Sequence, residues 1–354
     1  MNARELFNSI MFYGDFDRVP AYHWAAWSET MVRWESEGIP AGADVCALLE
    51  ADRMPPQVPI EGWLYPKFEE QTMEETEEYR IFRQADGVVA QHWKHRSCIP
   101  HYVDFTLKDR KSWEPFRERL QPDPGRIPKD LDATIAKLAA SGQPLSVSTG
   151  SMAGWIRDWM GVLGFAYLQQ DDPELVGEMV DTISDLICWC IDQALPKIRV
   201  DMGWGWEDIC GRNGPLVTPS LFDKYMVPGY RKISNRLLDY GVRLHVVDCD
   251  GLIDALVPLW LKAGVNVMFP IEIGAWNADP MAFRKKYGKE LRVIGGIDKL
   301  AIPKGPKAID EEINRRLPLM REGGFIPLPD HFITPDASVE NYRYYLRKIR
   351  ELRF

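Results

Sequence analysis

Short apolar runs alternate with longer segments of helical periodicity along the chain from Pro128 onward. Strands of a buried parallel sheet read as continuous apolar runs, whereas covering helices repeat apolar residues every three to four positions. The pattern predicts six strands after residue 140, at 145–149, 198–202, 244–247, 265–269, 291–297 and 325–328. Such an alternation is typical of strand–helix units that build an α/β fold.

Helical periodicity predicts the segments that separate these strands. Asp172 and Pro173 have the residue types of an N-cap and a first helical turn, and Pro228 should kink the helix that contains it. The predicted helices span residues 130–140, 174–195, 218–240, 252–263, 280–286, 307–322 and 338–352.

The N-terminal third is less regular. We expect a leading helix at 2–13, a strand at 19–24, an amphipathic segment at 28–37, an insertion of short helices at 41–80 and a hairpin at 81–95. With two weaker strands before residue 140, eight units fit a (β/α)8 TIM barrel with this N-terminal insertion. We expect one barrel domain over 1–354, in which 1–126 carries the insertions and 127–354 the regular units.

An open dinucleotide-binding sheet is the alternative fold. It needs a Gly-rich phosphate fingerprint that opens a helix after the first strand. The segment GWGWEDICG, residues 203–211, has the wrong position and too bulky an interior for that role. The barrel is therefore favoured.

Polar side chains follow nearly every predicted strand, and in parallel barrels the chemistry takes place at this edge. We predict catalytic roles for Asp248, Glu207, Asp330 and His331. Tryptophans cluster in the same loops and predict an apolar, aromatic pocket. The predicted substrate-binding residues are His23, Trp24, Trp27, Trp155, Trp204 and Trp206.

Structural roles compete with these assignments. His245 lies inside a strand, where a lone histidine is as often a core residue as a ligand. Cys249 fits packing as well as ligation, and Asp330 with His331 fits a turn. The tryptophan loops also suit a protein interface.

Composition excludes several function classes. The net charge of -9 over 354 residues offers no basic stripe for nucleic acid, and no apolar run reaches the length of a membrane helix. The N-terminus lacks an apolar signal segment, and six scattered cysteines indicate reduced thiols. We expect a cytoplasmic protein.

Five motifs occur in order: WEDICGRNGPLVTPSLFDKYMVPGYRKI, HVVDCDG, AGVNVMFPIE, YGKELRVIGGIDK and GGFIPLPDHFITPDASVENYRYY. Together they resemble the uroporphyrinogen decarboxylase superfamily over roughly residues 140–350. The resemblance implies a (β/α)8 barrel, and the superfamily contains tetrapyrrole decarboxylases and corrinoid-linked methyltransferases. Decarboxylases carry an Arg-rich N-terminal motif that grips carboxylates, whereas this chain has DRVPAYHWAAWSETMVRW there.

The methyltransferase branch, of the O-demethylase methyltransferase I type, implies a metal site. In that branch zinc is held by a His-x-Cys pair on the strand matching residues 244–247 and by a cysteine near Asp330 and His331. This chain keeps His245, but has Val247 and His331 in place of the two cysteines. The resemblance therefore implies a harder nitrogen and oxygen site with His245, Glu272 and His331 as candidate ligands, and Cys249 is a further candidate ligand.

We expect an enzyme that removes a methyl group from a small aromatic methyl ether. The acceptor would be cobalamin, as the corrinoid of a separate protein, and zinc or an acid would assist the leaving oxygen. A homodimer is consistent with the resemblance. A decarboxylase-like carboxy-lyase and a non-catalytic corrinoid-binding module are the alternatives. The hypothesis requires His245, Glu272 and His331 to share one cavity.

Overall fold

The computed structural model describes residues 1–95, 98–274 and 276–354. Its centre is a six-stranded parallel sheet in the order β14-β13-β12-β11-β8-β7, flanked by a parallel pair, β1 and β2. Single parallel bridges join Ala26 to Ile333 and Gln57 to Ser146, which connects the pair to both edges of the larger sheet. The described strands therefore follow one another in sequence order around a (β/α)8-type ring, as predicted. They are β1 (Tyr22–His23), β2 (Asp52–Arg53), β7 (Ser146–Gly150), β8 (Met202–Trp206), β11 (Leu244–Asp248), β12 (Val267–Phe269), β13 (Arg292–Ile297) and β14 (Phe325–Pro329).

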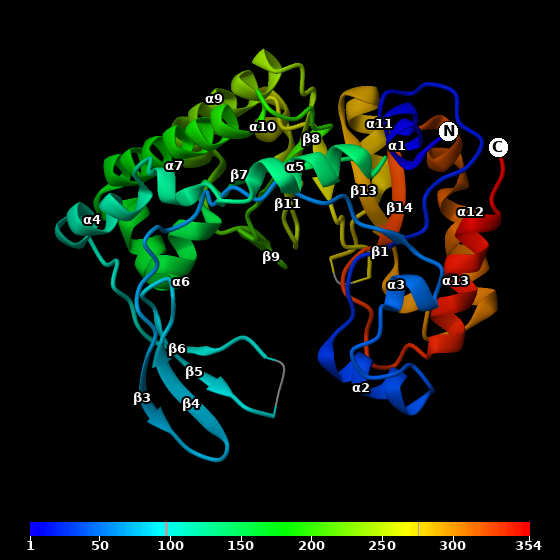
Figure 1. Cartoon of the computed structure of the whole chain (residues 1–354), viewed down its shortest axis with the longest axis horizontal. Helices are drawn as coiled ribbons and strands as arrows, with labels where there is room; N and C mark the ends of the chain where they lie inside the picture. The colour runs from blue at the N-terminus through cyan, green and yellow to red at the C-terminus, as the bar shows by residue number, and fades with distance from the viewer. Residues whose placement is uncertain (96–97, 275) are drawn as a thin grey trace.

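Helices cover the outside of these strands (Figure 1). Long buried apolar stripes on α7 and α12 pack against the sheet, so the core is shared between the strands and this outer layer. The helices are α5 (Leu131–Ala140), α6 (Gly154–Asp171), α7 (Pro173–Ala194), α8 (Pro219–Leu221), α9 (Val227–Asp239), α10 (Val257–Lys262), α11 (Pro280–Tyr287), α12 (Pro306–Glu322) and α13 (Val339–Glu351).

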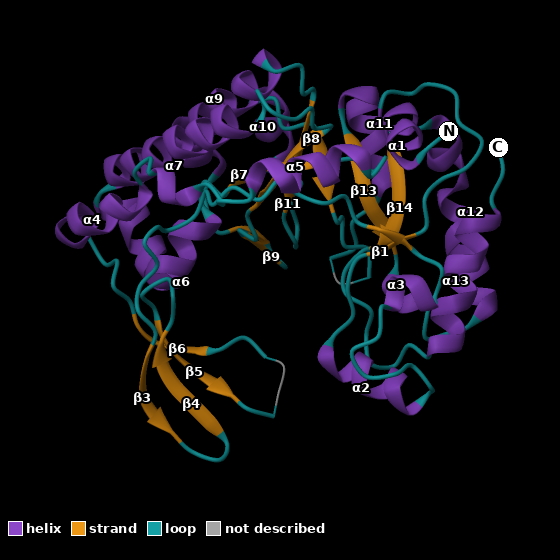
Figure 2. Cartoon of the chain, viewed as in Figure 1, coloured by secondary structure: helices purple, strands orange, loops and turns teal. Residues whose placement is uncertain are grey.

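The N-terminal third forms the leading helix α1 (Ala3–Met11), α2 (Ser28–Ser36), α3 (Val45–Leu48), a four-stranded antiparallel sheet and α4 (Arg110–Arg117). The sheet contains β3 (Gln71–Glu75), β4 (Tyr79–Arg83), β5 (Val89–Trp93) and β6 (His101–Asp104). It extends away from the barrel, as the orange strands at the lower left of Figure 2 show. The predicted hairpin at 81–95 is confirmed as β4 and β5.

Several predictions of local structure were wrong. The segment 41–80 is not a run of short helices, because it contains the barrel strand β2 and the start of the antiparallel sheet. The predicted strand 198–202 lies four residues too early. In β8, Gly203 and Gly205 face the side chain of Thr149, so Trp204 and Trp206 extend from the other side of a regular strand. The predicted helix 252–263 begins only at Val257, because the Leu252 N–H donates to the carbonyl of Gly211.

The predicted N-cap of the helix at 174–195 is confirmed. The Asp172 side chain accepts from the Leu175 N–H at 3.2 Å, as expected of an N-cap. Before Pro228, the helix widens into a π-turn over Phe222–Met226. No helix within the described residues combines the length and apolar character needed to cross a membrane.

Candidate active site

Three aspartates meet at the C-terminal ends of β8 and β11. Asp208, Asp248 and Asp250 each present a carboxylate oxygen, and these oxygens lie within 4.8 Å of one another. Within residues 1–95, 98–274 and 276–354, no other group of three or more His, Cys, Asp or Glu side chains is this close. We call these residues the acid trio. They form a set of hard oxygen donors, and ionisation of all three is disfavoured because like charges repel at this distance.

The backbone turns sharply to bring the acid trio together. Asp208 has a left-handed conformation with φ 48°, which Asp tolerates better than most residues. Its Oδ1 accepts the N–H of Asp250 at 3.2 Å, which ties the two loops together. Gly251 follows with φ +84°, and an added Cβ there would lie 2.4 Å from the carbonyl oxygen of Cys210. The close approach of these two loops therefore requires glycine at position 251.

Crowding changes the protonation of the acid trio. Burial, then the charges of Asp208 and Asp250, raise the pKa of Asp248 well above its ordinary value. Burial and the Asp250 carboxylate also raise the pKa of Asp208. The Asp248 side chain is half-buried, and within the described residues no hydrogen bond or ion pair engages its carboxyl. Asp248 therefore combines a raised pKa with the lack of a structural partner. Its carboxyl keeps its proton toward neutral pH and remains available to a ligand.

Asp248 also lines a cavity of about 240 Å³ inside the barrel. The indoles of Trp24 and Trp204 form two of its walls, and both pack edge-on to the ring of Phe269, with centroid distances of 4.6 and 5.0 Å. The remaining lining residues are Met54, Pro55, Gln57 and Ser146. An aromatic cavity with one protonated acid in its wall is suited to a small, mostly apolar ligand with one polar atom.

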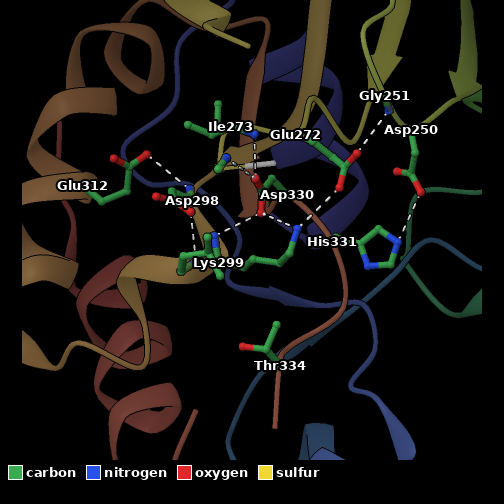
Figure 3. Close-up of polar contacts among 12 residues, drawn as sticks. Asp250, Gly251, Glu272, Ile273, Asp298, Lys299, Glu312, Asp330, His331 and Thr334 are labelled. Atoms are coloured by element: carbon green, nitrogen blue, oxygen red, sulfur yellow. Dashed lines mark hydrogen bonds and ion pairs between the residues drawn. The ribbon is translucent and has the colours of Figure 1, made fainter. Parts of the chain in front are cut away.

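The imidazole of His331 and the ammonium group of Lys299 lie at the same rim (Figure 3). The Nε2 atom of His331 lies 3.2 Å from Asp250 Oδ2. Lys299 Nζ lies 3.5 Å from both Glu272 and Asp330, so its charge is shared between two carboxylates. Glu272 also accepts the N–H of Gly251 at 3.1 Å, and burial, followed by the Asp250 charge, raises its pKa.

Arg157 occupies the opposite side of the rim. Its guanidinium donates to Asp158 Oδ1 at 2.7 Å and to the carbonyl oxygen of Asp208. The same group lies over the ring of Trp206, 5.4 Å from the ring centroid. Arg157 therefore fixes the loop that carries Asp208 and holds Trp206 in a cation–π contact.

Two predicted catalytic carboxylates have structural surroundings instead. Glu207 is almost fully buried and accepts the backbone N–H groups of Met152, Ala153 and Gly154, the Ser151 hydroxyl and the Tyr230 hydroxyl. It thereby satisfies the unpaired amides at the start of α6. Burial nevertheless raises its pKa. Its lone pairs are directed at protein donors, so the prediction of a catalytic Glu207 is not supported by its position.

Asp330 is the second such carboxylate. It accepts the N–H groups of Ile273 at 2.6 Å, Gly274 at 3.3 Å and Lys299 at 3.0 Å, and it has no exposed surface. It therefore joins the loops after β12, β13 and β14, as Figure 3 shows at its centre. Like Glu207, it positions the rim and does not face the cavity.

The four predicted metal ligands do not converge. His245 points to the helix layer, where Nδ1 lies 2.8 Å from the Ser234 hydroxyl of α9 and Nε2 lies 3.0 Å from the Thr149 hydroxyl. Burial lowers the pKa of His245 to about 3, so the ring is neutral. Cys249 is buried and donates to the carbonyl of Asp250. The requirement that His245 share a cavity with Glu272 and His331 is not met, and these residues do not fit a zinc ion.

The predicted substrate-binding residues fall into two groups. Trp24 and Trp204 line the cavity, while Trp27 stacks on His331 at the rim with a centroid distance of 5.6 Å and a 17° interplanar angle. The other three lie elsewhere. His23 contacts the Tyr342 hydroxyl of α13 at 2.8 Å, Trp155 packs on Trp159, and Trp206 is covered by Arg157. Burial lowers the pKa of His23 to about 4.

The residues selected from the sequence did not include Asp208, Asp250, Lys299 or Arg157. Asp208 and Asp250 were visible as acids that directly follow strands, beside residues that were selected. Lys299 follows the strand that ends at Ile297, so its position carried the same signal. Arg157 lies inside a helix, where nothing in the sequence distinguishes it from a surface arginine.

Comparisons with known proteins agree with this architecture. Residues 129–352 match the family model described as uroporphyrinogen decarboxylase (URO-D). A uroporphyrinogen decarboxylase of Sphingopyxis alaskensis is 23% identical over 286 residues, which cover 71% of this chain and 70% of that protein. One from Hahella chejuensis is 22% identical over 234 residues, covering 64% of this chain and 61% of that protein.

A solved structure of a methyltransferase from Methanosarcina mazei has the same fold. It superposes with a TM-score of 0.63 over 99% of both chains at 13% sequence identity. The family match covers more than half of the chain and includes β7 through α13. The chain belongs to the uroporphyrinogen decarboxylase (URO-D) family.

Proposed function

We propose that this protein is a methyltransferase that removes a methyl group from a small aromatic methyl ether and passes it to the cobalt of a corrinoid carried by a separate protein. One observation carries the proposal. The unpartnered Asp248 carboxyl, whose pKa is raised, lines a cavity walled by two indoles. The fold shared with a methyltransferase and the family membership are consistent with it.

The cavity favours a small donor. Its volume of about 240 Å³ is below the roughly 300–1,000 Å³ of pockets that hold drug-sized ligands. Trp24 and Trp204 present flat apolar surfaces on which an aryl ring can stack or pack edge-on. A ring held there places its ether oxygen toward Asp248, because this is the ionisable side chain in the cavity wall.

Asp248 supplies the proton that the reaction needs. A reduced corrinoid would supply the electron pair for the new bond to the methyl carbon, while the bond from that carbon to the ether oxygen would break and leave its electron pair on the oxygen. An alkoxide or phenoxide leaves poorly unless its charge is neutralised. The Asp248 carboxyl transfers its proton to this oxygen and becomes a carboxylate, so the leaving group departs as a neutral alcohol or phenol.

Methyl transfer to free reduced cobalamin, followed by its absorbance change on methylation, tests this function. With an active methoxyarene, Asp248→Asn should lower the rate about 10²–10⁴-fold, as expected when a general acid is lost. Asp132→Asn is the matched control, because Asp132 lies on α5 and is an exposed ion-pair partner of Lys197. Full activity in Asp248→Asn, or no methylcobalamin from any methoxyarene, would contradict the proposal.

Decarboxylation of a tetrapyrrole is the rival function, because two relatives are named uroporphyrinogen decarboxylases. A substrate with several carboxylates requires cationic donors. Of the described cations at this rim, Lys299 and Arg157 are engaged by protein carboxylates, and His331 faces Asp250. Stepwise release of carbon dioxide from uroporphyrinogen would establish the rival and reject the methyltransferase.

A further inference from the structure

The charge at the mouth of the cavity is unbalanced. The acid trio places three carboxyl groups within 4.8 Å of one another, and Glu272 lies near enough for the Asp250 charge to act on it. The imidazole of His331 contacts the trio directly, through Asp250. The guanidinium of Arg157 contacts the backbone carbonyl of Asp208 while its ion pair is with Asp158.

Lys299 does not correct this imbalance. Its ammonium group lies 3.5 Å from Glu272 and 3.5 Å from Asp330, so one charge already faces two carboxylates. The ionisable groups of the described rim therefore include more acids than cations. With Asp248 holding its proton, a positively charged ligand group would relieve the repulsion between the carboxylates of Asp208 and Asp250, and a negatively charged one would add to it.

The walls of the cavity also favour a cationic ligand. The faces of Trp24 and Trp204 carry partial negative charge from their π-electrons and attract cations. Asp248 is both in the wall of the cavity and in the acid trio, so it connects the aromatic space with the other two carboxylates. Its carboxyl has no partner within the described residues. A ligand in the cavity therefore meets two indoles and the Asp248 carboxyl, and oxygens of Asp208 and Asp250 lie within 4.8 Å of that carboxyl.

We propose that the methyl donor bears a positively charged nitrogen, which Asp208 and Asp250 receive while its ring lies between Trp24 and Trp204. This inference rests on the proposed function and assigns the substrate class of the same site. It separates the expected donor, a cationic methoxyarene, from methoxybenzoate-type donors, whose carboxylate the trio repels. In this arrangement Asp208 and Asp250 determine specificity, and Asp248 acts on the ether oxygen.

Three probes of matched shape test the charge preference. They are 2-methoxybenzylamine, 2-methoxybenzyl alcohol and 2-methoxybenzoate, which place the methyl ether beside the second group on the ring, as the closely spaced trio requires, and are cationic, neutral and anionic at neutral pH. Dissociation constants measured by calorimetry on the full chain should rise about tenfold from amine to alcohol and about tenfold again to benzoate. Added salt should reduce these differences, since it screens charges near solvent.

Asp208→Asn provides the variant arm. Asn tolerates the left-handed backbone of position 208 and keeps an oxygen that accepts the N–H of Asp250, so the loop should persist. The variant should bind the amine about tenfold more weakly and leave binding of the alcohol unchanged. Asp132→Asn should bind all three probes as the wild type does. Asp250→Asn serves as a second variant if Asp208→Asn fails to fold.

The outcomes separate this inference from the proposed function. Equal affinity for the three probes, or tightest binding of the benzoate, overturns the cationic donor, even where a probe still methylates cobalamin. Preference for the amine without methyl transfer from any methoxyarene retains the cation site and rejects the methyltransferase. If none of the three probes binds, both are rejected.

Discussion

Two sets of carboxylates lie at the same rim of this barrel and have opposite surroundings. Glu207 and Asp330 accept hydrogen bonds from three backbone N–H groups each, and neither lines the cavity. In the acid trio, the Asp248 side chain accepts none within the described residues. The comparison teaches that an acid at a strand end is structural or chemical according to the donors that reach it, because those donors decide whether its lone pairs remain available.

The two sets also depend on each other. Glu207 fixes the start of α6, which carries Arg157, and the Arg157 guanidinium binds the Asp208 carbonyl. Asp330 accepts the N–H of Ile273 and so fixes the loop after β12 next to Glu272. The fully bonded acids thus hold the loops that keep three carboxylates at a distance where they repel. Stability and function are divided between neighbouring residues of the same chemical type.

Removing a fully bonded acid should have the largest effect on stability. Asp330→Ala leaves the amides of Ile273, Gly274 and Lys299 without their acceptor and separates Lys299 from one of its two partners. We expect the free energy of unfolding to fall by about 3–5 kcal/mol, the cost of breaking a buried, hydrogen-bonded ion pair. Urea titration followed by tryptophan fluorescence measures this change.

Asp132→Ala is the control for that experiment. Asp132 pairs with Lys197 at 2.8 Å, but its side chain is 83% exposed. Solvent screening should limit the loss to below about 1 kcal/mol. A comparable loss in both variants would mean that burial and hydrogen bonding do not distinguish the carboxylates of the rim.

The order of the barrel strands was predictable, because the strands β11 to β14 are short runs of mainly apolar residues bounded by glycine, proline or acids. The exceptions have physical causes. In β8 the glycines at 203 and 205 remove the apolar signal from one face, although they allow close packing against Thr149. The strand β2 has only two residues, Asp52 and Arg53, and therefore contains no apolar run. Its pairing with β1 is visible only in the structure.

The location of the candidate site at the strand ends was predictable, but the residues that form it were not. Side chains alternate along a strand, so His245 and Asp248, three residues apart on β11, must face opposite sides. Asp248 pairs in register with Trp206 and Phe269 on the inner face, and His245 pairs with Gly203 on the outer face. That alternation could have excluded His245 from a shared cavity with Asp248. The donors that occupy Glu207 and Asp330 come from loops distant in sequence, which no local pattern reveals.

Removing the unpartnered acid should increase stability, in contrast to Asp330→Ala. Burial and the neighbouring carboxylates raise the folded-state pKa of Asp248 above its unfolded value near 3.8. The contribution of Asp248 to stability is therefore fully present below about pH 4 and is lost as the pH rises through the raised folded-state pKa. Asp248→Asn should match the wild type near pH 4 and exceed it by about 1–3 kcal/mol at neutral pH.

Denaturant unfolding of both proteins across this pH range measures that difference. The difference between variant and wild type isolates Asp248 from the other acids whose pKa values are raised, apart from its coupling to Asp208 and Asp250. A variant that is less stable than the wild type at neutral pH would show that the Asp248 carboxyl has a structural partner after all.

The smallest expected effect concerns the contact between the acid trio and its histidine. His331 Nε2 lies 3.2 Å from Asp250 Oδ2, and both side chains are partly exposed, at 19% and 26%. A double-mutant cycle of His331→Gln and Asp250→Asn should give a coupling of about 0.5–1 kcal/mol, since solvent screens such pairs. His331→Gln alone also loses its stacking on Trp27, so its total cost should exceed the coupling. A coupling of zero with an unchanged cost for His331→Gln would assign His331 to aromatic packing and leave Asp250, like Asp248, without a stabilising partner.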